Sequence, residues 1–170
     1  LLSYSGGNKL QNNALTASKT DFHVAGSLLM NYEQDIDTTN TVEGKKMYYL
    51  VGKSGDTIPS DAGYVGIVHS SDMTVQDLTL HGILLAHTTD STIQNVVISG
   101  HFGIYLRFST GNTILANTIT TSGYGMYLEE ADGNTFSENT IASDFRGIIL
   151  IHSIDNVLTG NSITVTGGTD

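Results

Sequence analysis

The side chains best suited to acid–base chemistry are three acids, Glu129, Glu130 and Asp132, with Arg107 and Arg146 nearby in the sequence. Paired carboxylates cleave glycosidic bonds, and clustered acids bind calcium in enzymes that cleave polysaccharides. Arg107 and Glu129 are placed to form a surface ion pair, which explains both residues. No second carboxylate is placed opposite Glu130 at glycosidase distance. The sequence therefore predicts no catalytic residue and no enzyme.

Histidines offer a second kind of chemistry. His69 and His87 share one predicted column with Phe108, Glu130 and His152, so two imidazoles on neighbouring turns could hold a metal. A column that also accepts Phe108 and Glu130 is equally explained as a strand edge that tolerates large side chains. The chain has no cysteine, which excludes disulfides and thiolate ligands. We expect no metal and no cofactor, with His69 and His87 as the two weak candidates.

Aromatic side chains offer a binding surface. Tyr105 and Tyr127 share an outward column with Leu84 and Ile149, and this column is largely apolar, although a solvated sheet face should be polar. Exposed tyrosine rings can stack on sugars, and an apolar face can also be an interface. The alternative is that loops of the same chain, at 26–40 and 52–63, cover this face.

A sequence repeat must position all these residues. The segment Asn112–Ile119 recurs 22 residues later, and again after another 22. A second repeated segment, here called the second phrase, precedes each copy. The first phrase reads Asn112-Thr113-Ile114-Leu115-Ala116-Asn117-Thr118-Ile119, Asn134-Thr135-Phe136-Ser137-Glu138-Asn139-Thr140-Ile141 and Asn156-Val157-Leu158-Thr159-Gly160-Asn161-Ser162-Ile163. The second reads Gly103-Ile104-Tyr105-Leu106, Gly125-Met126-Tyr127-Leu128 and Gly147-Ile148-Ile149-Leu150. Short strands at a fixed period in the low twenties indicate a solenoid.

The composition selects the type of solenoid. The units are rich in Thr, Ile, Val, Asn and Gly, which fits a parallel β-helix better than a leucine-rich repeat. We predict one all-β domain over 1–170, a right-handed parallel β-helix of about seven turns. Residues 1–63 are expected to form irregular turns with the two long loops, and 64–170 regular turns. Strand is expected from Leu2, and Leu10 and Val42 are assigned to the Ile114 position.

Four columns of apolar residues are predicted to point into the coil. They are Val65/Ile83/Ile104/Met126/Ile148, Ile67/Leu85/Leu106/Leu128/Leu150, Val75/Ile93/Ile114/Phe136/Leu158 and Leu80/Ile98/Ile119/Ile141/Ile163. Asn117, Asn139 and Asn161 are predicted to form an internal ladder whose amides satisfy the bend, so that Asn139→Leu costs about 1 to 3 kcal/mol. A second set, Asn8, Asn112, Asn134 and Asn156, follows turn positions that need left-handed backbone.

Charge and hydropathy exclude other classes. Seventeen acidic and seven basic residues give a net charge of −10, which repels nucleic acid. Apolar residues are too dispersed for a membrane span. The sequence opens Leu1-Leu2-Ser3-Tyr4, without the charged and apolar regions of a signal peptide, and could be a processed or excised piece.

The repeats resemble the NosD-like right-handed parallel β-helix family, also described as carbohydrate-binding and sugar-hydrolysis repeats. Beyond the Asn-Thr-Ile repeat, 35–50 and 61–68 are similar to segments of archaeal surface proteins of this family, with Gly44-Lys45-Lys46 where those often have Gly-Lys-Pro. The resemblance implies the fold. Members include a periplasmic copper-processing protein, surface-layer components and carbohydrate-active enzymes, so it implies no single chemistry.

These observations favour a non-catalytic structural module, extracellular or on the cell surface, that associates with itself or with further β-helix turns. A carbohydrate-binding module at Leu84, Tyr105, Tyr127 and Ile149 is the second hypothesis, alongside a polysaccharide-cleaving enzyme. A copper-handling periplasmic protein is the third. A binder should show a shallow groove with exposed aromatic rings, and an enzyme should show acids clustered in a cleft.

Overall fold

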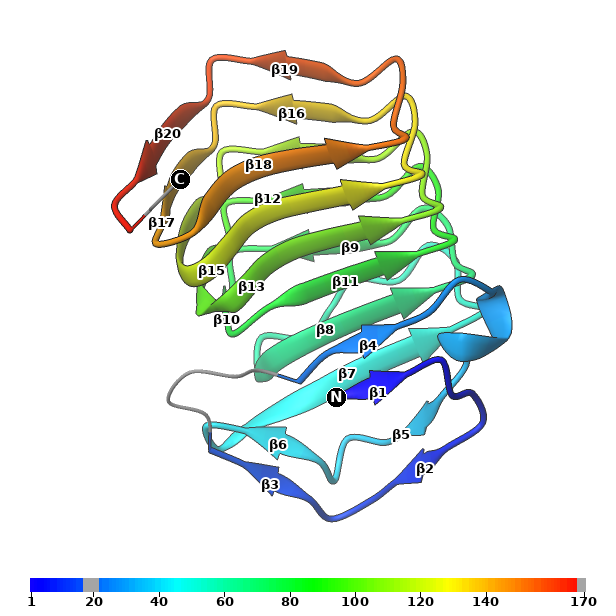
Figure 1. The fold of residues 1–170 in the computed structure, drawn as a ribbon. Helices are drawn as coiled ribbons and strands as arrows, with labels where there is room; N and C mark the ends of the chain where they lie inside the picture. The colour runs from blue at the N-terminus through cyan, green and yellow to red at the C-terminus, as the bar shows by residue number, and fades with distance from the viewer. Residues whose placement is uncertain (17–21, 168–170) are drawn as a thin grey trace.

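The chain is a coil of short parallel strands, seen in a computed structural model that describes residues 1–16 and 22–167 (Figure 1). It is an all-β solenoid of about seven turns, with one 3₁₀ turn, η1 (Leu29–Asn31), in the described part. The strands are β1 (Leu2–Ser3), β2 (Lys9–Leu10), β3 (Ala14–Leu15), β4 (Val24–Ala25), β5 (Asp35–Ile36), β6 (Thr41–Val42), β7 (Lys45–Val51), β8 (Ala62–Val68), β9 (Thr74–Gln76), β10 (Thr79–Leu80), β11 (Ile83–Ala86), β12 (Thr92–Gln94), β13 (Val97–Arg107), β14 (Thr113–Leu115), β15 (Thr118–Glu129), β16 (Thr135–Ser137), β17 (Thr140–Ser143), β18 (Arg146–Ile151), β19 (Val157–Thr159) and β20 (Ser162–Val165).

Two parallel sheets form the walls of the coil. The larger runs through β7, β8, β11, β13, β15 and β18, and the smaller contains β9, β12, β14, β16 and β19. Figure 1 shows the larger sheet in front with strands pointing right, while β16 and β19 return to the left as the coil rises. The coil is therefore right-handed, as the sequence predicts.

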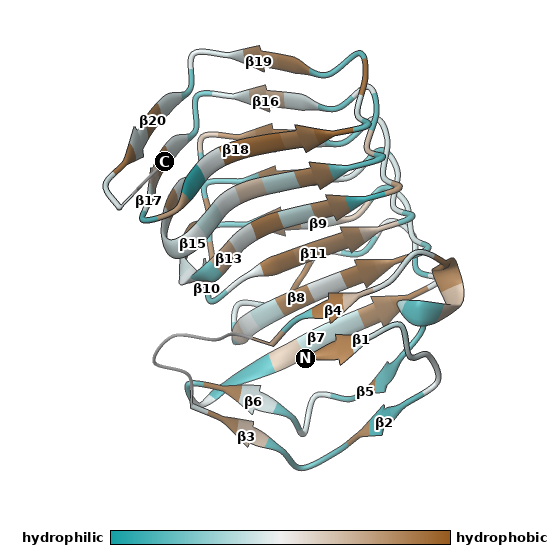
Figure 2. Ribbon diagram, viewed as in Figure 1, coloured by the Kyte–Doolittle hydropathy of each residue, from teal (hydrophilic) through white to brown (hydrophobic). Residues whose placement is uncertain are grey.

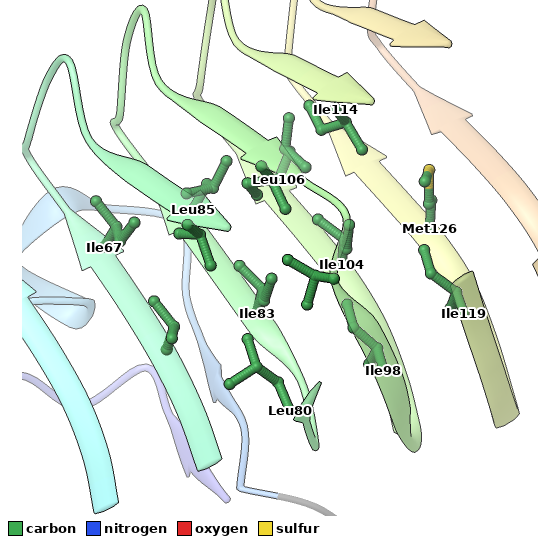
Figure 3. Packing of buried hydrophobic residues seen from close by; sticks show 14 of the residues in the cluster. Ile67, Leu80, Ile83, Leu85, Ile98, Ile104, Leu106, Ile114, Ile119 and Met126 are labelled. Atoms are coloured by element: carbon green, nitrogen blue, oxygen red, sulfur yellow. The ribbon is translucent and has the colours of Figure 1, made fainter. Parts of the chain in front are cut away.

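The predicted inward columns are confirmed by the strand register. Ile83 pairs with Val65 and Ile104, and Phe136 pairs with Ile114 and Leu158. One continuous apolar core inside the coil contains Val65, Ile83, Ile104, Ile114 and Phe136, and Figure 3 shows part of it. Leu158, at the last described turn, lies outside this core and is 42% exposed. Because outward residues alternate with inward ones, the ribbon in Figure 2 alternates between brown and paler or teal segments along several strands.

The glycine that begins the second phrase lies inside the long strands β13 and β15 and is needed for their close packing. A Cβ on Gly103 would lie 2.2 Å from the carbonyl oxygen of Gly125, and one on Gly125 would lie 2.5 Å from that of Gly147. The isoleucine methyl groups at Ile119 and Ile141 approach the same positions within 2.6 and 2.4 Å. Only glycine allows successive turns to pack this closely here.

Asparagine side chains line one bend of the coil, and the structure joins the three that the sequence singles out. Asn117 donates to Asn139 Oδ1 from its backbone N (3.0 Å) and from Nδ2 (2.9 Å). Asn139 donates in the same way to Asn161, at 3.0 and 2.9 Å. Each Nδ2 also reaches a backbone carbonyl of the preceding turn, at Ile93 for Asn117 and at Ile114 for Asn139. The ladder thus satisfies both side-chain and backbone groups at a buried bend.

A second asparagine ladder lies at the other end of the smaller sheet. Asn112 donates to Asn134 Oδ1 at 2.9 and 3.0 Å, and Asn134 donates to Asn156 at 2.9 and 3.2 Å. The residues before them are in the left-handed region, as expected, with φ of 69° at Gly111 and 63° at Gly133. The sequence placed these asparagines after turns but did not foresee their ladder.

The N-terminal unit, residues 1–16 and 22–42, differs from the predicted first turns of the coil. Its strands pair in parallel, and Leu10 lies opposite Ile36 while Leu15 lies opposite Val42. The assignment of Val42 to the Ile114 position is therefore wrong, because Val42 matches the later strand of the unit. A two-residue hairpin at Glu43 (φ 48°) and Gly44 (φ 77°) then reverses the chain, and β6 pairs antiparallel with β7.

The N-terminal unit covers the outward face of the larger sheet. Tyr32 and Val24 pack in a second apolar cluster with Leu84 and Tyr105 of the coil, and all four are buried. Figure 1 shows β1 and β4 crossing in front of the lower strands of that sheet. The sequence allowed two alternatives for this apolar face: an open binding or interface surface, or coverage by other segments of the same chain. The structure shows coverage by the N-terminal unit for the part of the face up to Tyr105.

The segment 52–63 is predicted to be a surface loop, and most of its residues are exposed, but it does not cover the outward face. Ser54 and Thr57 form parallel bridges with Ser71 and Thr74 of the next turn, and Ile58 is buried in the coil core. This segment therefore forms the back of the first coil turn instead of covering the outward face. No helix in the described ranges is long and apolar enough to cross a membrane.

Candidate functional site

A pocket of about 230 Å³ opens where the N-terminal unit ends on the larger sheet. Five ring-bearing side chains line it, and they come from three segments of the chain. These are His23, next to β4, Phe102 and Tyr105 of β13, and Tyr124 and Tyr127 of β15. The pocket is therefore aromatic on every side that the structure describes.

The strand register brings the coil's four rings together. Phe102 pairs with Tyr124 and Tyr105 with Tyr127, so that each pair occupies one outward column on adjacent strands. The Phe102 and Tyr124 rings stack in parallel with centroids 5.3 Å apart. Tyr127 stands edge-on to both tyrosines, 5.3 Å from Tyr105 and 5.4 Å from Tyr124. These are favourable aromatic geometries, which hold the rings in place without a ligand.

His23 closes the pocket from the N-terminal unit. Its ring stacks on Phe102, with centroids 4.6 Å apart, and lies 5.3 Å from Tyr105. Burial among these rings disfavours the imidazolium and lowers the pKa of His23 to about 4. At neutral pH the pocket therefore contains an uncharged imidazole.

His23 should make stability depend on pH. Its folded pKa of about 4 is below the unfolded value of 6.5, so its contribution is complete above pH 6.5 and is lost as the pH falls toward 4. We expect the parent to lose up to about 3 kcal/mol of unfolding free energy more than His23→Phe over this interval. Urea melts of both proteins at several pH values measure the difference. Parallel stability curves for the two proteins would contradict it.

Only two of the four residues that the sequence predicts for a binding surface line the aromatic pocket. Tyr105 and Tyr127 both line the pocket, with Tyr105 only 7% exposed. Leu84 is buried beneath the N-terminal unit and does not reach the pocket. Ile149 continues the column next to Tyr127 and is partly exposed, outside the pocket lining. The candidate site is therefore narrower than the predicted column.

Sequence reasoning missed three of the five lining residues. Phe102 and Tyr124 each precede the recurring glycine of the second phrase, and Arg146 has the same position in the next copy. That 22-residue spacing was a usable signal for one aromatic column. His23 has no such signal, because it comes from the N-terminal unit and no repeat relates it to the coil.

The acids near Arg107 form a charge cluster beside the pocket. Arg107 is 6% exposed and contacts the carboxylates of Glu129 and Glu130, the latter at 3.4 Å. Tyr105 donates its hydroxyl to Glu129 at 3.3 Å, and Asp132 accepts the backbone N–H of Ile154 at 2.8 Å. Ion pairing and hydrogen bonding therefore engage these acids within the fold. Arg146, expected in the same cluster, lies against Phe145 instead.

His69 and His87 line a second, more open hollow of about 480 Å³, together with Lys53 and several hydroxyl side chains. The His87 ring stacks on Phe108 at 4.7 Å, and burial lowers its pKa. No group of three His, Cys, Asp or Glu side chains that could hold a metal occurs in the part of the chain that the structure describes. The two histidines are thus brought together without a third ligand of these types.

Residues 39–169 match the family model described as periplasmic copper-binding protein (NosD). The match covers the hairpin and the whole coil, but not His23 or most of the N-terminal unit. No curated protein and no solved structure gives a significant match. A copper centre does not fit His69 and His87, since no third His, Cys, Asp or Glu ligand joins them in the described ranges and the Lys53 ammonium shares their hollow. On the extent of the match, the chain belongs to the NosD family.

Proposed function

We propose that this NosD-family β-helix domain is a non-catalytic carbohydrate-binding module. The aromatic pocket is the observation that carries the proposal. The sequence alone favours a self-associating structural module, but much of the apolar face behind that preference lies under the N-terminal unit. What stays open next to the covered part is a pocket of aromatic rings.

Sugar rings suit such a pocket for a physical reason. One face of a pyranose carries mainly C–H groups, which pack on aromatic rings, and its hydroxyls stay near polar groups at the rim. Tyr105, Tyr124 and Tyr127 supply rings with hydroxyls, and their mutual contacts fix them before a ligand arrives. A preorganised site loses little conformational entropy on binding.

Removing one wall of the pocket should weaken binding. Tyr127→Ala should weaken binding of the best oligosaccharide at least about tenfold, because a central aromatic contact of a small site is lost. A glycan array followed by calorimetry on the best ligand measures this. The same samples should release no sugar product, and Glu130→Gln should change nothing in that assay.

Tyr4→Ala is the matched control, since Tyr4 is 72% exposed and lies outside the aromatic pocket. It should bind like the parent. Equal loss in both variants, or no glycan binding by the parent, would contradict the site. Product release that depends on Glu130 would instead favour the polysaccharide-cleaving alternative.

Self-association is the second candidate, and one observation favours it. Inward-column residues of the last described turn are exposed, by 41% at Leu150, 42% at Leu158 and 47% at Ile163. Another copy, or further β-helix turns, could cover this apolar end and pair with its strand edges. Sedimentation should show concentration-dependent assembly that Leu158→Lys reduces. A parent that stays monomeric at high concentration argues against it.

The proposed setting is outside the cytoplasm, in the periplasm or on the cell surface. The family description supports the periplasm, and the resemblance to archaeal surface proteins supports a surface layer, sheath or filament. Both settings hold glycans that an aromatic pocket could bind.

A further inference from the structure

Three basic side chains of this acidic protein, Lys45, Lys53 and Arg146, take part in no ion pair within residues 1–16 and 22–167. Lys9, Lys46 and Arg107 pair with carboxylates, and Lys45 donates to a backbone carbonyl. The remaining two described cations, Lys53 and Arg146, take part in none of the ion pairs. With 17 acidic residues against seven basic ones, an exposed arginine without a carboxylate partner is notable.

Arg146 lies next to the aromatic pocket, one strand beyond its lining residues. On β18 it pairs in register with Tyr124, so its backbone lies one strand spacing, about 4.8 Å, from a residue that lines the pocket. Its guanidinium carbon is 5.2 Å from the centroid of the Phe145 ring. Phe145 in turn contacts Tyr124 edge to face at 5.2 Å. An aromatic ring therefore supports the guanidinium beside the pocket.

The nearest acid in sequence has another partner. Asp144 accepts a hydrogen bond from the Thr166 hydroxyl at 2.7 Å, and no ion pair joins it to Arg146. The fork of guanidinium N–H donors is thus not engaged by a carboxylate of the described chain, and it suits a ligand carboxylate in a planar, two-bond arrangement.

We propose that the pocket selects acidic saccharides, with a uronic acid ring against the aromatic side chains and its carboxylate on Arg146. This inference rests on the proposed carbohydrate-binding function and names its ligand class. The net charge of −10 repels anionic polymers at long range, so selection must come from direct contact with Arg146. Lys53 lies in the separate hollow with His69 and His87 and does not contribute.

The test uses matched ligands that differ only in charge. Oligosaccharides of galacturonic, glucuronic and mannuronic acid are compared with their methyl esters, which keep the ring and remove the negative charge. By calorimetry, the parent should bind the best acid about five to ten times more tightly than its ester. Arg146→Gln should remove this preference while still binding the ester, and Arg146→Lys should restore only part of it.

Lys53→Gln is the control for a general loss of positive charge and should keep the full preference. Equal binding of acid and ester by the parent, or an acid preference that persists in Arg146→Gln, overturns the role of Arg146 and leaves the carbohydrate site standing. If the parent binds neither acids nor esters nor any neutral glycan, both the acidic selectivity and the carbohydrate function fail. Retained ester binding by Arg146→Gln also shows that the variant is folded.

Discussion

Asn139→Leu is expected to destabilise the coil by about 3 to 4 kcal/mol, more than the range of about 1 to 3 kcal/mol expected from the sequence alone. Asn139 is fully buried and takes part in hydrogen bonds both above and below its own turn. Its loss leaves the backbone N–H and one amide N–H of Asn117 without partners in the interior, and removes the donor that Asn139 Nδ2 supplies to the carbonyl of Ile114. Leucine has a similar volume but supplies no hydrogen bond, so the cost is mainly that of unpaired polar groups.

Denaturant melts of Asn139→Leu, with Asn161→Leu as the control, measure this effect. Asn161 lies in the same column, where its Nδ2 donates to the carbonyl of Phe136 at 2.8 Å, but it is partly exposed at the last described turn. Water can replace part of what is lost there, so the control should cost clearly less. Equal costs, or a neutral Asn139→Leu, would mean that the ladder contributes little to stability.

Tyr32→Ala should release the N-terminal unit from the coil, at a cost of about 3 to 5 kcal/mol. Tyr32 is fully buried in the second apolar cluster. Its hydroxyl donates to the carbonyl of Gly26 at 2.7 Å, and its own carbonyl accepts from the Tyr49 hydroxyl at 2.6 Å. Hydrogen exchange should show lost protection in residues 22–42, while strands β12 to β16 keep theirs.

Met30→Ala is the matched control for Tyr32→Ala, because Met30 belongs to the 3₁₀ turn that Tyr32 directly follows but is 61% exposed. It should change stability by less than about 0.5 kcal/mol. If Tyr32→Ala instead lowers protection evenly through the whole coil, the N-terminal unit and the coil form one cooperative body, and the proposed local release is wrong.

The coil was predictable because the period of the repeat determines which residues pair on neighbouring strands. At a 22-residue period, Ile114, Phe136 and Leu158 must stack, and any shift by one residue would point polar neighbours inward. The same logic failed near the N-terminus, where Asn40-Thr41-Val42 resembles either end of the repeated phrase. A local turn decided the outcome, since left-handed Glu43 and Gly44 reverse the chain.

The candidate site was only partly predictable. Tyr105 and Tyr127 follow from alternation along regular strands. Phe102 lies beyond a register shift between β13 and β15, and alternation cannot be counted through such an irregularity. His23 reaches the pocket through tertiary packing between segments distant in sequence, which no local pattern encodes.

The docking of the N-terminal unit has a consequence for the order of folding. Turns of the coil contact their neighbours, so the coil can grow turn by turn as the polypeptide lengthens. Tyr32 and Val24 are made early, but their apolar partners include Leu84 and Tyr105, which are made much later. Contacts between such distant segments form slowly and leave apolar surface exposed meanwhile. During synthesis or export, residues 22–42 should therefore be the part of the chain that a chaperone holds longest.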